Sequence, residues 1–456
     1  MTRPTDKRWS SQLAFYVGAV GVAVGLGSIW RFPYLAGVHG GSVFVFAFVL
    51  ACLLIAAPLL VAEFMIGRRS RMSPPQAAGE LAAAAGLSTR WNSIGWLGTV
   101  AVLIIGGYYI VIAGWVLAYT WKCAVGTVTN SATPAEAAAL FDAFRADPLE
   151  MGAWHLAFLC LVAWISARGL ARGIEVVNLL RAPALLVLLL ILTGYALYTG
   201  DVERGLHFAF APDFSKLSAE VMLAAIGQAF FATGVGMAVM IAYGAYVGRD
   251  VSLVHSALVT TGSIVVVSLL ATLMVFPLVY GYGMNPAQGS ELVFHVLPAA
   301  FAEMPAGRLI GTLFFLLLVF AALTPSIAVL EPSVAWAEQR FQVSRGRAVI
   351  IVTAVTWLLG IGSVLSFNYW ADWKPLSWIA LLSDQTFFGV SDYIASNVLL
   401  PFGALLTSLF IGWRLDWGIA EDELAVERRG VRVAIRFLLR WVCPFAIAAV
   451  MATSIA

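Results

Sequence analysis

Long hydrophobic stretches recur along the whole chain, and they restrict its fold more than any other feature of the sequence. Each is about as long as a helix must be to cross the ~30 Å hydrocarbon core of a bilayer. Only 11% of the 456 residues are charged and 61% are hydrophobic, which leaves too few charges to cover a water-soluble protein of this size. We therefore predict an all-α membrane protein with 11 transmembrane helices. The spans are expected at 11–35, 40–66, 94–121, 152–167, 174–199, 219–247, 254–280, 308–337, 347–365, 386–412 and 433–454.

The positions of Lys and Arg predict how these helices cross the membrane. Basic residues gather before the first span, in the loops that follow the second, fourth and eighth spans, and before the eleventh. Because Lys and Arg are retained on the cytoplasmic side, we expect residues 1–10 to be a cytoplasmic N-terminal segment. The odd number of spans then places the C-terminus outside an inner or plasma membrane. The intervening loop 281–306 is expected to carry an outer helix near 291–304, and 416–440 a cytoplasmic amphipathic helix.

Several functional classes receive no support from the composition. The four cysteines and five histidines show no paired or clustered ligand spacing, so neither a disulfide framework nor a Cys/His metal centre is indicated. The spans contain no pair of a nucleophile and a base arranged as in an enzyme, and no motif for an organic cofactor is present. A net charge of +2 gives no indication of a nucleic-acid partner. We expect the lipid bilayer as the main partner, with the protein present as a monomer or dimer.

The first hydrophobic span is interrupted by Gly21, Gly25 and Gly27. Each glycine costs a helix about 1 kcal/mol relative to alanine, and unwinding at bilayer depth exposes backbone groups that hydrocarbon cannot satisfy. A close-packing face of the Gly-xxx-Gly type is the alternative explanation. The sixth span favours unwinding, because Gly227, Gly234 and Gly236 interrupt it as well.

Two interrupted helices five spans apart predict an inverted repeat of five helices each, with residues 11–199 forming the first repeat and 219–412 the second. Residues 433–454 are then an additional eleventh helix. Broken helices at corresponding positions of two halves are typical of secondary transporters, whose substrate and ion sites lie between them.

The sequence resembles the neurotransmitter:sodium symporter family over nearly its whole length. The resemblance is strongest in the motif from Ala23 to Tyr34, AVGLGSIWRFPY. It continues in His39-Gly40-Gly41, Pro58, Glu63, Tyr108-Tyr109, Gly227-Gln228-Ala229-Phe230-Phe231 and Ala321-Ala322-Leu323-Thr324. The resemblance implies a leucine-transporter-like fold and ion-coupled import of an amino acid by alternating access. Eleven spans, instead of the usual twelve, resemble a bacterial subgroup.

The resemblance also implies which residues meet the substrate. The amino and carboxyl groups of the substrate are expected at Ala23, Leu26, Gly27, Tyr109, Phe231 and Ala232, and its side chain at Ile105, Gly234, Met237, Pro325 and Val329. Because this set is mostly apolar and Gly234 leaves room, we predict a neutral substrate with a bulky apolar or aromatic side chain.

One sodium site of the family matches Gly21, Val24, Ala321 and Thr324, whose oxygens suit a small hard cation. The fifth family ligand is replaced by Pro325, for which Ser326 or water is a substitute. The family's other sodium site maps to Ser28, Ala232 and Ile264, of which only Ser28 carries a side-chain oxygen. We therefore expect one sodium ion, and no chloride dependence although Gln228 and Ser268 remain.

Four charged residues complete the prediction. Arg31 and Asp392 match the outer gate of the family, while Glu63 and Glu331 are intramembrane carboxylates and hence candidates for proton coupling. At the inner gate the chain departs from the family, with Asp6 and Gln339 in place of a basic and an acidic residue. Lys7 or Arg8 with Glu338 are the available substitutes.

Two alternatives to a sodium-coupled importer stay open at this point. The first is a proton-coupled amino-acid transporter. The second is a transporter-like receptor or regulatory membrane protein that binds a ligand without ion coupling, which the lost cation ligands at Ala232, Ile264 and Pro325 would permit.

Overall fold

The computed structural model describes residues 9–128, 134–211, 213–283, 293–294 and 296–455. Within these ranges the chain forms helices joined by turns, without strands. Nine of the described helices are long and apolar enough to cross a membrane, and a tenth span is made by two helices bent by 51°. The remaining predicted span, 219–247, corresponds to a 15-residue helix followed by a shorter one.

The first five spans follow one another along the chain, with helices of their own in two of the connections. They comprise α1 (Gln12–Ala23) with α2 (Phe32–Val38), α3 (Ser42–Ala51) with α4 (Ala57–Ser70), α6 (Ser93–Ala124), α8 (Pro148–Ala167) and α9 (Glu175–Thr199). The fourth span begins four residues earlier than predicted. Its start is set by polar chemistry, because the Asp147 carboxylate accepts hydrogen bonds from the amides of Leu149 and Glu150 and Pro148 occupies the first turn.

The second set of spans has the same order of elements. It comprises α11 (Ala219–Thr233) with α12 (Val239–Gly244), α13 (Leu253–Gly281), α15 (Gly307–Phe341), α16 (Arg345–Leu365) and α17 (Phe387–Tyr393) with α18 (Leu400–Leu409). The last span runs from α20 (Arg429–Phe437) into α21 (Cys443–Ile455). The prediction of one loop helix over 416–440 was wrong: α19 (Trp417–Glu423) ends early, and residues from Arg429 onward already belong to the last span.

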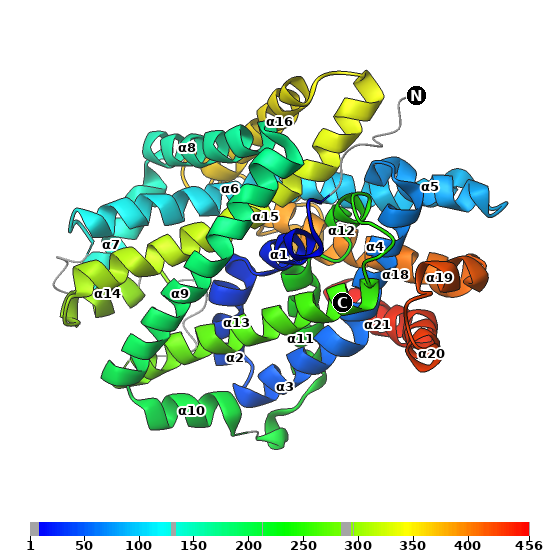
Figure 1. Cartoon of the computed structure of the whole chain (residues 1–456). Helices are drawn as coiled ribbons and strands as arrows, with labels where there is room; N and C mark the ends of the chain where they lie inside the picture. Colours follow the sequence, from blue (N-terminus) through cyan, green and yellow to red (C-terminus); the bar gives the residue numbers. More distant parts are fainter. Residues whose placement is uncertain (1–8, 129–133, 212, 284–292, 295, 456) are drawn as a thin grey trace.

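Short helices in the loops gather on two sides of the molecule (Figure 1). On the left and lower side lie α7 (Pro134–Ala146), α10 (Val202–Phe210) and α14 (Val296–Glu303), all from loops predicted to face outside. On the right lie α5 (Pro74–Ala84) and α19, from loops predicted to be cytoplasmic. The outer helix predicted near 291–304 is thus present as α14, although 284–292 and 295 lie outside the described residues.

Small residues allow the central helix α6 to approach its neighbours closely. A Cβ atom built on Gly107 would lie 2.7 Å from Leu359 Cβ of α16, and one built on Gly114 would lie 2.8 Å from the His155 backbone of α8. Helix packing in a bilayer depends on such contacts because water does not drive it. The central helix is therefore held by close backbone contact with α8 and α16.

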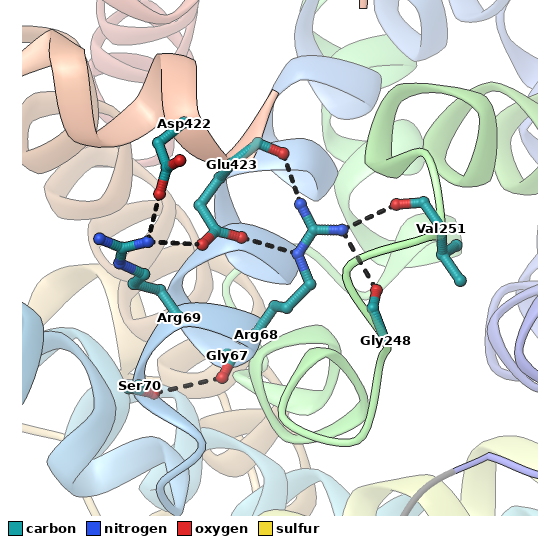
Figure 2. A network of polar contacts seen from close by, with 8 residues as sticks. All are labelled: Gly67, Arg68, Arg69, Ser70, Gly248, Val251, Asp422 and Glu423. Carbon is teal, nitrogen blue, oxygen red and sulfur yellow. Dashed lines mark hydrogen bonds and ion pairs between the residues drawn. The ribbon is translucent and has the colours of Figure 1, made fainter. Parts of the chain in front are cut away.

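A buried ion pair joins α4 to α19 at the side where α5 also lies (Figure 2). Arg68 Nε donates to Glu423 Oε2 at 2.7 Å, and both side chains are at most 3% exposed. The other guanidinium nitrogens donate to the Glu423 carbonyl and to the Val251 carbonyl, the latter at 2.7 Å (Figure 2). Beside it, the more exposed Arg69 pairs with Asp422 and Glu423. A fully satisfied guanidinium therefore holds α4, α19 and the loop before α13 together.

This network predicts a large difference between two adjacent substitutions. Glu423→Ala leaves the Arg68 charge buried without its partner and is expected to destabilise the protein by roughly 3–5 kcal/mol. Asp422→Ala removes half of an exposed pair and is expected to cost less than about 1 kcal/mol. Thermal unfolding of the two purified variants in detergent checks this; similar unfolding temperatures would contradict it.

Candidate functional site

The first break interrupts the helix formed by α1 and α2. Helix α1 ends at Ala23, Val24 leaves helical geometry with φ −88° and ψ 83°, and a π-helical turn, Gly27–Arg31, leads into α2. The last carbonyl groups of α1 consequently lose partners that a continuous helix would supply. One of them, the Ala23 carbonyl, accepts a hydrogen bond from Ser28 Oγ at 3.4 Å. The predicted interruption of the first span is thus present at the predicted glycines.

The second break separates α11 from α12. Gly234 and Gly236 have φ values of 69° and 84°, in the left-handed region that glycine adopts without strain, and Ala238 follows at 56°. The Gly236 amide donates to Glu63 Oε1 of α4 at 2.7 Å, and Glu63 is 1% exposed. A carboxyl group thus compensates a backbone group that the break leaves unpaired.

One side chain connects α11 to the first break. Gln228 Nε2 of α11 donates to the Gly27 carbonyl at 2.7 Å. The Gln228 Oε1 atom and the hydroxyl of Ser268 on α13 are buried without a protein partner. The two interrupted helices therefore face each other across a polar contact inside the bilayer region.

Between the breaks lies a small cavity of about 40 Å³. We call it the inner cavity. Every residue that the sequence predicted for the substrate lines it, except Leu26. Its other lining residues, Val22, Gly25 and Val239, were not predicted. Gly25 could have been included from its place between Ala23 and Gly27.

Helix α6 contributes Tyr109 to the wall of the inner cavity. Its side chain is 6% exposed, and its hydroxyl donates its hydrogen to no described protein group. A Cβ atom built on Gly25 would lie 3.3 Å from that hydroxyl oxygen, so Tyr109 reaches the break in the first helix. An unused donor at this position is available to an anionic ligand group.

A second cavity, the outer cavity, has a volume of about 200 Å³. It shares Gly27, Tyr109 and Phe231 with the inner cavity. Leu26, Arg31 and Asp392 also line it, so the predicted gate residues face one common space. Tyr109 and Phe231 thus stand between the two cavities.

Arg31 and Asp392 do not form a direct ion pair in this conformation, and each has another partner. The Arg31 guanidinium lies over the Phe231 ring, 4.5 Å from its centroid. Asp392 Oδ1 accepts a hydrogen bond from Ser396 at 3.1 Å, and Ser396 in turn lies 3.4 Å from the Tyr108 hydroxyl. The two charges share a cavity without closing it.

The residues of the predicted sodium site come together where α1 ends against α15. The Thr324 methyl group would lie 3.0 Å from a Cβ built on Gly21, and Thr324 Oγ1 donates to Asn178 Oδ1 of α9 at 2.8 Å. Backbone carbonyls and a hydroxyl are donors that suit a small hard cation. The residues thus provide donors of the right kind, but Pro325 supplies no fifth donor and an arginine, Arg181, lies beside them.

The carboxylate predicted on α15, Glu331, is held in an ion pair. Its Oε2 atom accepts from Arg345 Nη2 at 2.6 Å, and its Oε1 atom from the Tyr246 hydroxyl at 3.3 Å. Arg345 also contacts Glu338 at 3.5 Å. The substitute inner-gate residues Lys7 and Arg8, together with Asp6, lie outside the described residues. Gln339 accepts a hydrogen bond from the Ser73 amide.

The side chains missed by the sequence prediction are Arg181 and Asn178 of α9. Arg181 Nη1 donates to the Phe320 carbonyl at 2.8 Å, and its Nη2 atom would lie 3.2 Å from a Cβ on Gly21. A charged residue inside a hydrophobic span is itself a signal of function, which the sequence prediction did not use. No group of three or more His, Cys, Asp or Glu side chains that could hold a metal ion occurs among the described residues.

Comparison with known proteins connects this geometry to a family. The model of the sodium:neurotransmitter symporter family matches residues 6–133 and 147–373. The chain is 35% identical to the sodium-dependent transporter YhdH of Bacillus subtilis, covering 98% of this chain and 97% of YhdH. It is 31% identical to a sodium-dependent transporter of Haemophilus influenzae, covering 96% of each.

A solved structure extends the likeness to the fold. The crystal structure of MhsT in complex with L-phenylalanine aligns with a TM-score of 0.89 and 36% identity, over 99% of this chain and 100% of MhsT. The leucine-transporter-like fold and the multi-pass membrane architecture predicted from the sequence are thereby confirmed. The chain belongs to the sodium:neurotransmitter symporter family, a family of membrane secondary transporters.

Proposed function

We propose that the protein imports a neutral amino acid with a bulky apolar or aromatic side chain, driven by sodium and working by alternating access. The inner cavity carries the proposal, since it lies between the two helix breaks and is lined by residues predicted from the sequence alone. Residues 11–199 and 219–412 are the two repeats that would move about this cavity. The N-terminus is cytoplasmic in this proposal and the C-terminus lies outside the cell membrane.

The charged ends of an amino acid suit the broken helices. The helical segment that starts at Gly27 directs the positive end of its dipole toward the break, which favours a carboxylate. The Tyr109 hydroxyl supplies a further donor. The carbonyl groups released at the ends of α1 and α11 favour the ammonium group. Both ends of a zwitterion are thus matched without a charged protein side chain.

The rest of the inner cavity fits an apolar side chain. Ile105, Met237 and Val329 contribute hydrocarbon or thioether surface, and Gly234 leaves its position unfilled. MhsT, which shares the fold, was crystallised with L-phenylalanine. We therefore propose phenylalanine and amino acids of similar size and polarity as the substrate class.

Coupling is proposed through one sodium ion at Gly21, Val24, Ala321 and Thr324, next to the substrate. Two observations support sodium over protons. YhdH and the relative from Haemophilus influenzae are both named sodium-dependent transporters. Both intramembrane carboxyl groups have structural partners, Gly236 for Glu63 and Arg345 for Glu331. Closure of Arg31 toward Asp392 would seal the outer cavity.

Uptake into proteoliposomes tests the proposal as a whole. An inward sodium gradient is expected to drive accumulation of radiolabelled L-phenylalanine, and excess unlabelled aromatic or large aliphatic amino acids are expected to compete. Glycine, aspartate and lysine are expected not to compete. Binding without accumulation would instead identify a receptor, and accumulation driven by a pH gradient in sodium-free buffer a proton-coupled transporter.

Tyr109→Phe tests the contact with the substrate carboxylate. Because a hydrogen bond to a charged group contributes about 1.5–3 kcal/mol, the variant is expected to bind L-phenylalanine roughly 10- to 100-fold more weakly. Equilibrium binding to the purified protein measures this.

Tyr119→Phe is the matched control, since Tyr119 is on the same helix, is buried with an unpartnered hydroxyl, and lines neither cavity. Its affinity for L-phenylalanine is expected to stay within twofold of wild type. An equal loss in both variants would refute a specific role for Tyr109.

Glu63 separates a structural carboxyl group from a proton carrier. Glu63→Gln keeps an oxygen that can accept from the Gly236 amide, so sodium-driven uptake is expected to persist. Glu63→Leu leaves that amide unpaired at the break and is expected to destabilise the protein by about 1–3 kcal/mol. Uptake and thermal unfolding are measured on both variants; uptake lost in Glu63→Gln with stability retained would favour proton coupling.

A further inference from the structure

Arg181 carries a charge into the part of α9 that spans the membrane. The side chain is 5% exposed and reaches from α9 toward the junction of α1 and α15. Its Nη1 atom donates to the Phe320 carbonyl at 2.8 Å, and Phe320 directly precedes Ala321 in α15. Its Nη2 atom would lie 3.2 Å from a Cβ on Gly21. The guanidinium group therefore lies against both halves of the proposed sodium site.

No carboxylate balances this charge. Arg181 forms no ion pair within 4.0 Å among the residues that the structure describes, and its Nε atom has no hydrogen-bond partner. The polar side chains beside it, Asn178 and Thr324, are neutral. A buried charge is unfavourable unless polar groups compensate it. Among the described residues, the Phe320 carbonyl is the acceptor that compensates the Arg181 charge.

A sodium ion at Gly21, Val24, Ala321 and Thr324 would use the same end of α1 and the same turn of α15. Two positive charges a few ångströms apart repel strongly where water is excluded. Pro325 also removes a donor that would have favoured the ion. The arginine beside Gly21 therefore opposes binding of the ion at the adjacent site.

We propose that Arg181 is a tethered cation that competes with sodium for the site at the end of α1. Its guanidinium group lies against Gly21 of α1 when sodium is absent, and it must withdraw from Gly21 before sodium binds. This inference rests on the proposed sodium site. It adds an internal competitor that raises the sodium concentration needed for binding and assists the release of sodium.

Direct binding of ²²Na⁺ to the purified full-length protein tests the competition without a transport assay. Arg181→Gln removes the charge and keeps polar atoms, and it is expected to lower the sodium dissociation constant at least tenfold. Arg181→Lys keeps the charge and is the matched control, expected to bind sodium as weakly as wild type. Equal dissociation constants in all three proteins, or no binding by any of them, would overturn the inference.

Folding and function are checked separately. Size-exclusion profiles and circular dichroism establish whether each variant is folded. Arg181→Met is a second uncharged variant, to be used if Arg181→Gln does not fold. Binding of L-phenylalanine by wild type tests the proposed substrate independently. If wild type does not bind phenylalanine but Arg181→Gln still lowers the sodium dissociation constant, the substrate proposal alone is refuted. If wild type takes up phenylalanine but Arg181→Gln leaves the sodium dissociation constant unchanged, the role of Arg181 alone is refuted.

Discussion

Unpaired backbone groups in the middle of a bilayer are the constraint on which the rest of this structure depends. Hydrocarbon offers no hydrogen bonds, so a helix that unwinds there must find polar partners within the protein. Glu63 supplies one to the Gly236 amide, and Gln228 supplies another to the Gly27 carbonyl. Surrounding helices exclude lipid from the breaks. What is left unsatisfied faces the inner cavity, where a zwitterionic ligand and a cation can complete it.

The buried charges of this chain differ in how they are compensated. Arg68 is paired with Glu423 and bonded to three carbonyl groups, so its environment is complete. Glu331 is likewise matched by Arg345. Arg181 differs from both because it forms no ion pair with any residue in the described part of the chain, and its hydrogen bond goes to a neutral carbonyl group. A buried charge that is paired with an opposite charge holds helices together. A buried charge that only neutral groups compensate can exchange its hydrogen-bond partners at a small cost in free energy. That difference is why Arg181, and not the stronger networks, attracts a functional interpretation.

Much of the fold followed from hydrophobic length and glycine position. The helix breaks were predictable because glycines interrupt two spans at corresponding positions, a pattern typical of secondary transporters. The boundary at Asp147 was missed because capping depends on a polar residue just outside the apolar stretch. The ion pair between Arg68 and Glu423 joins residues 355 positions apart, and the sequence offers no local signal for such a pairing. Asn178 was missed for the same reason, since its role appears only when α9 is placed against α15. Arg181 was missed although a charge inside a hydrophobic span is a local signal.

Arg31 shows why a resemblance alone does not determine a conformation. The family pattern placed it opposite Asp392, yet here it lies over the Phe231 ring while Asp392 contacts Ser396. Phe231 also lines the inner cavity, so the same ring borders the proposed substrate site and contacts the gate arginine. A substrate side chain that repositions this ring would alter the surface on which Arg31 rests. Substrate binding in the inner cavity can thus be linked to closure of the outer cavity through the Phe231 side chain alone.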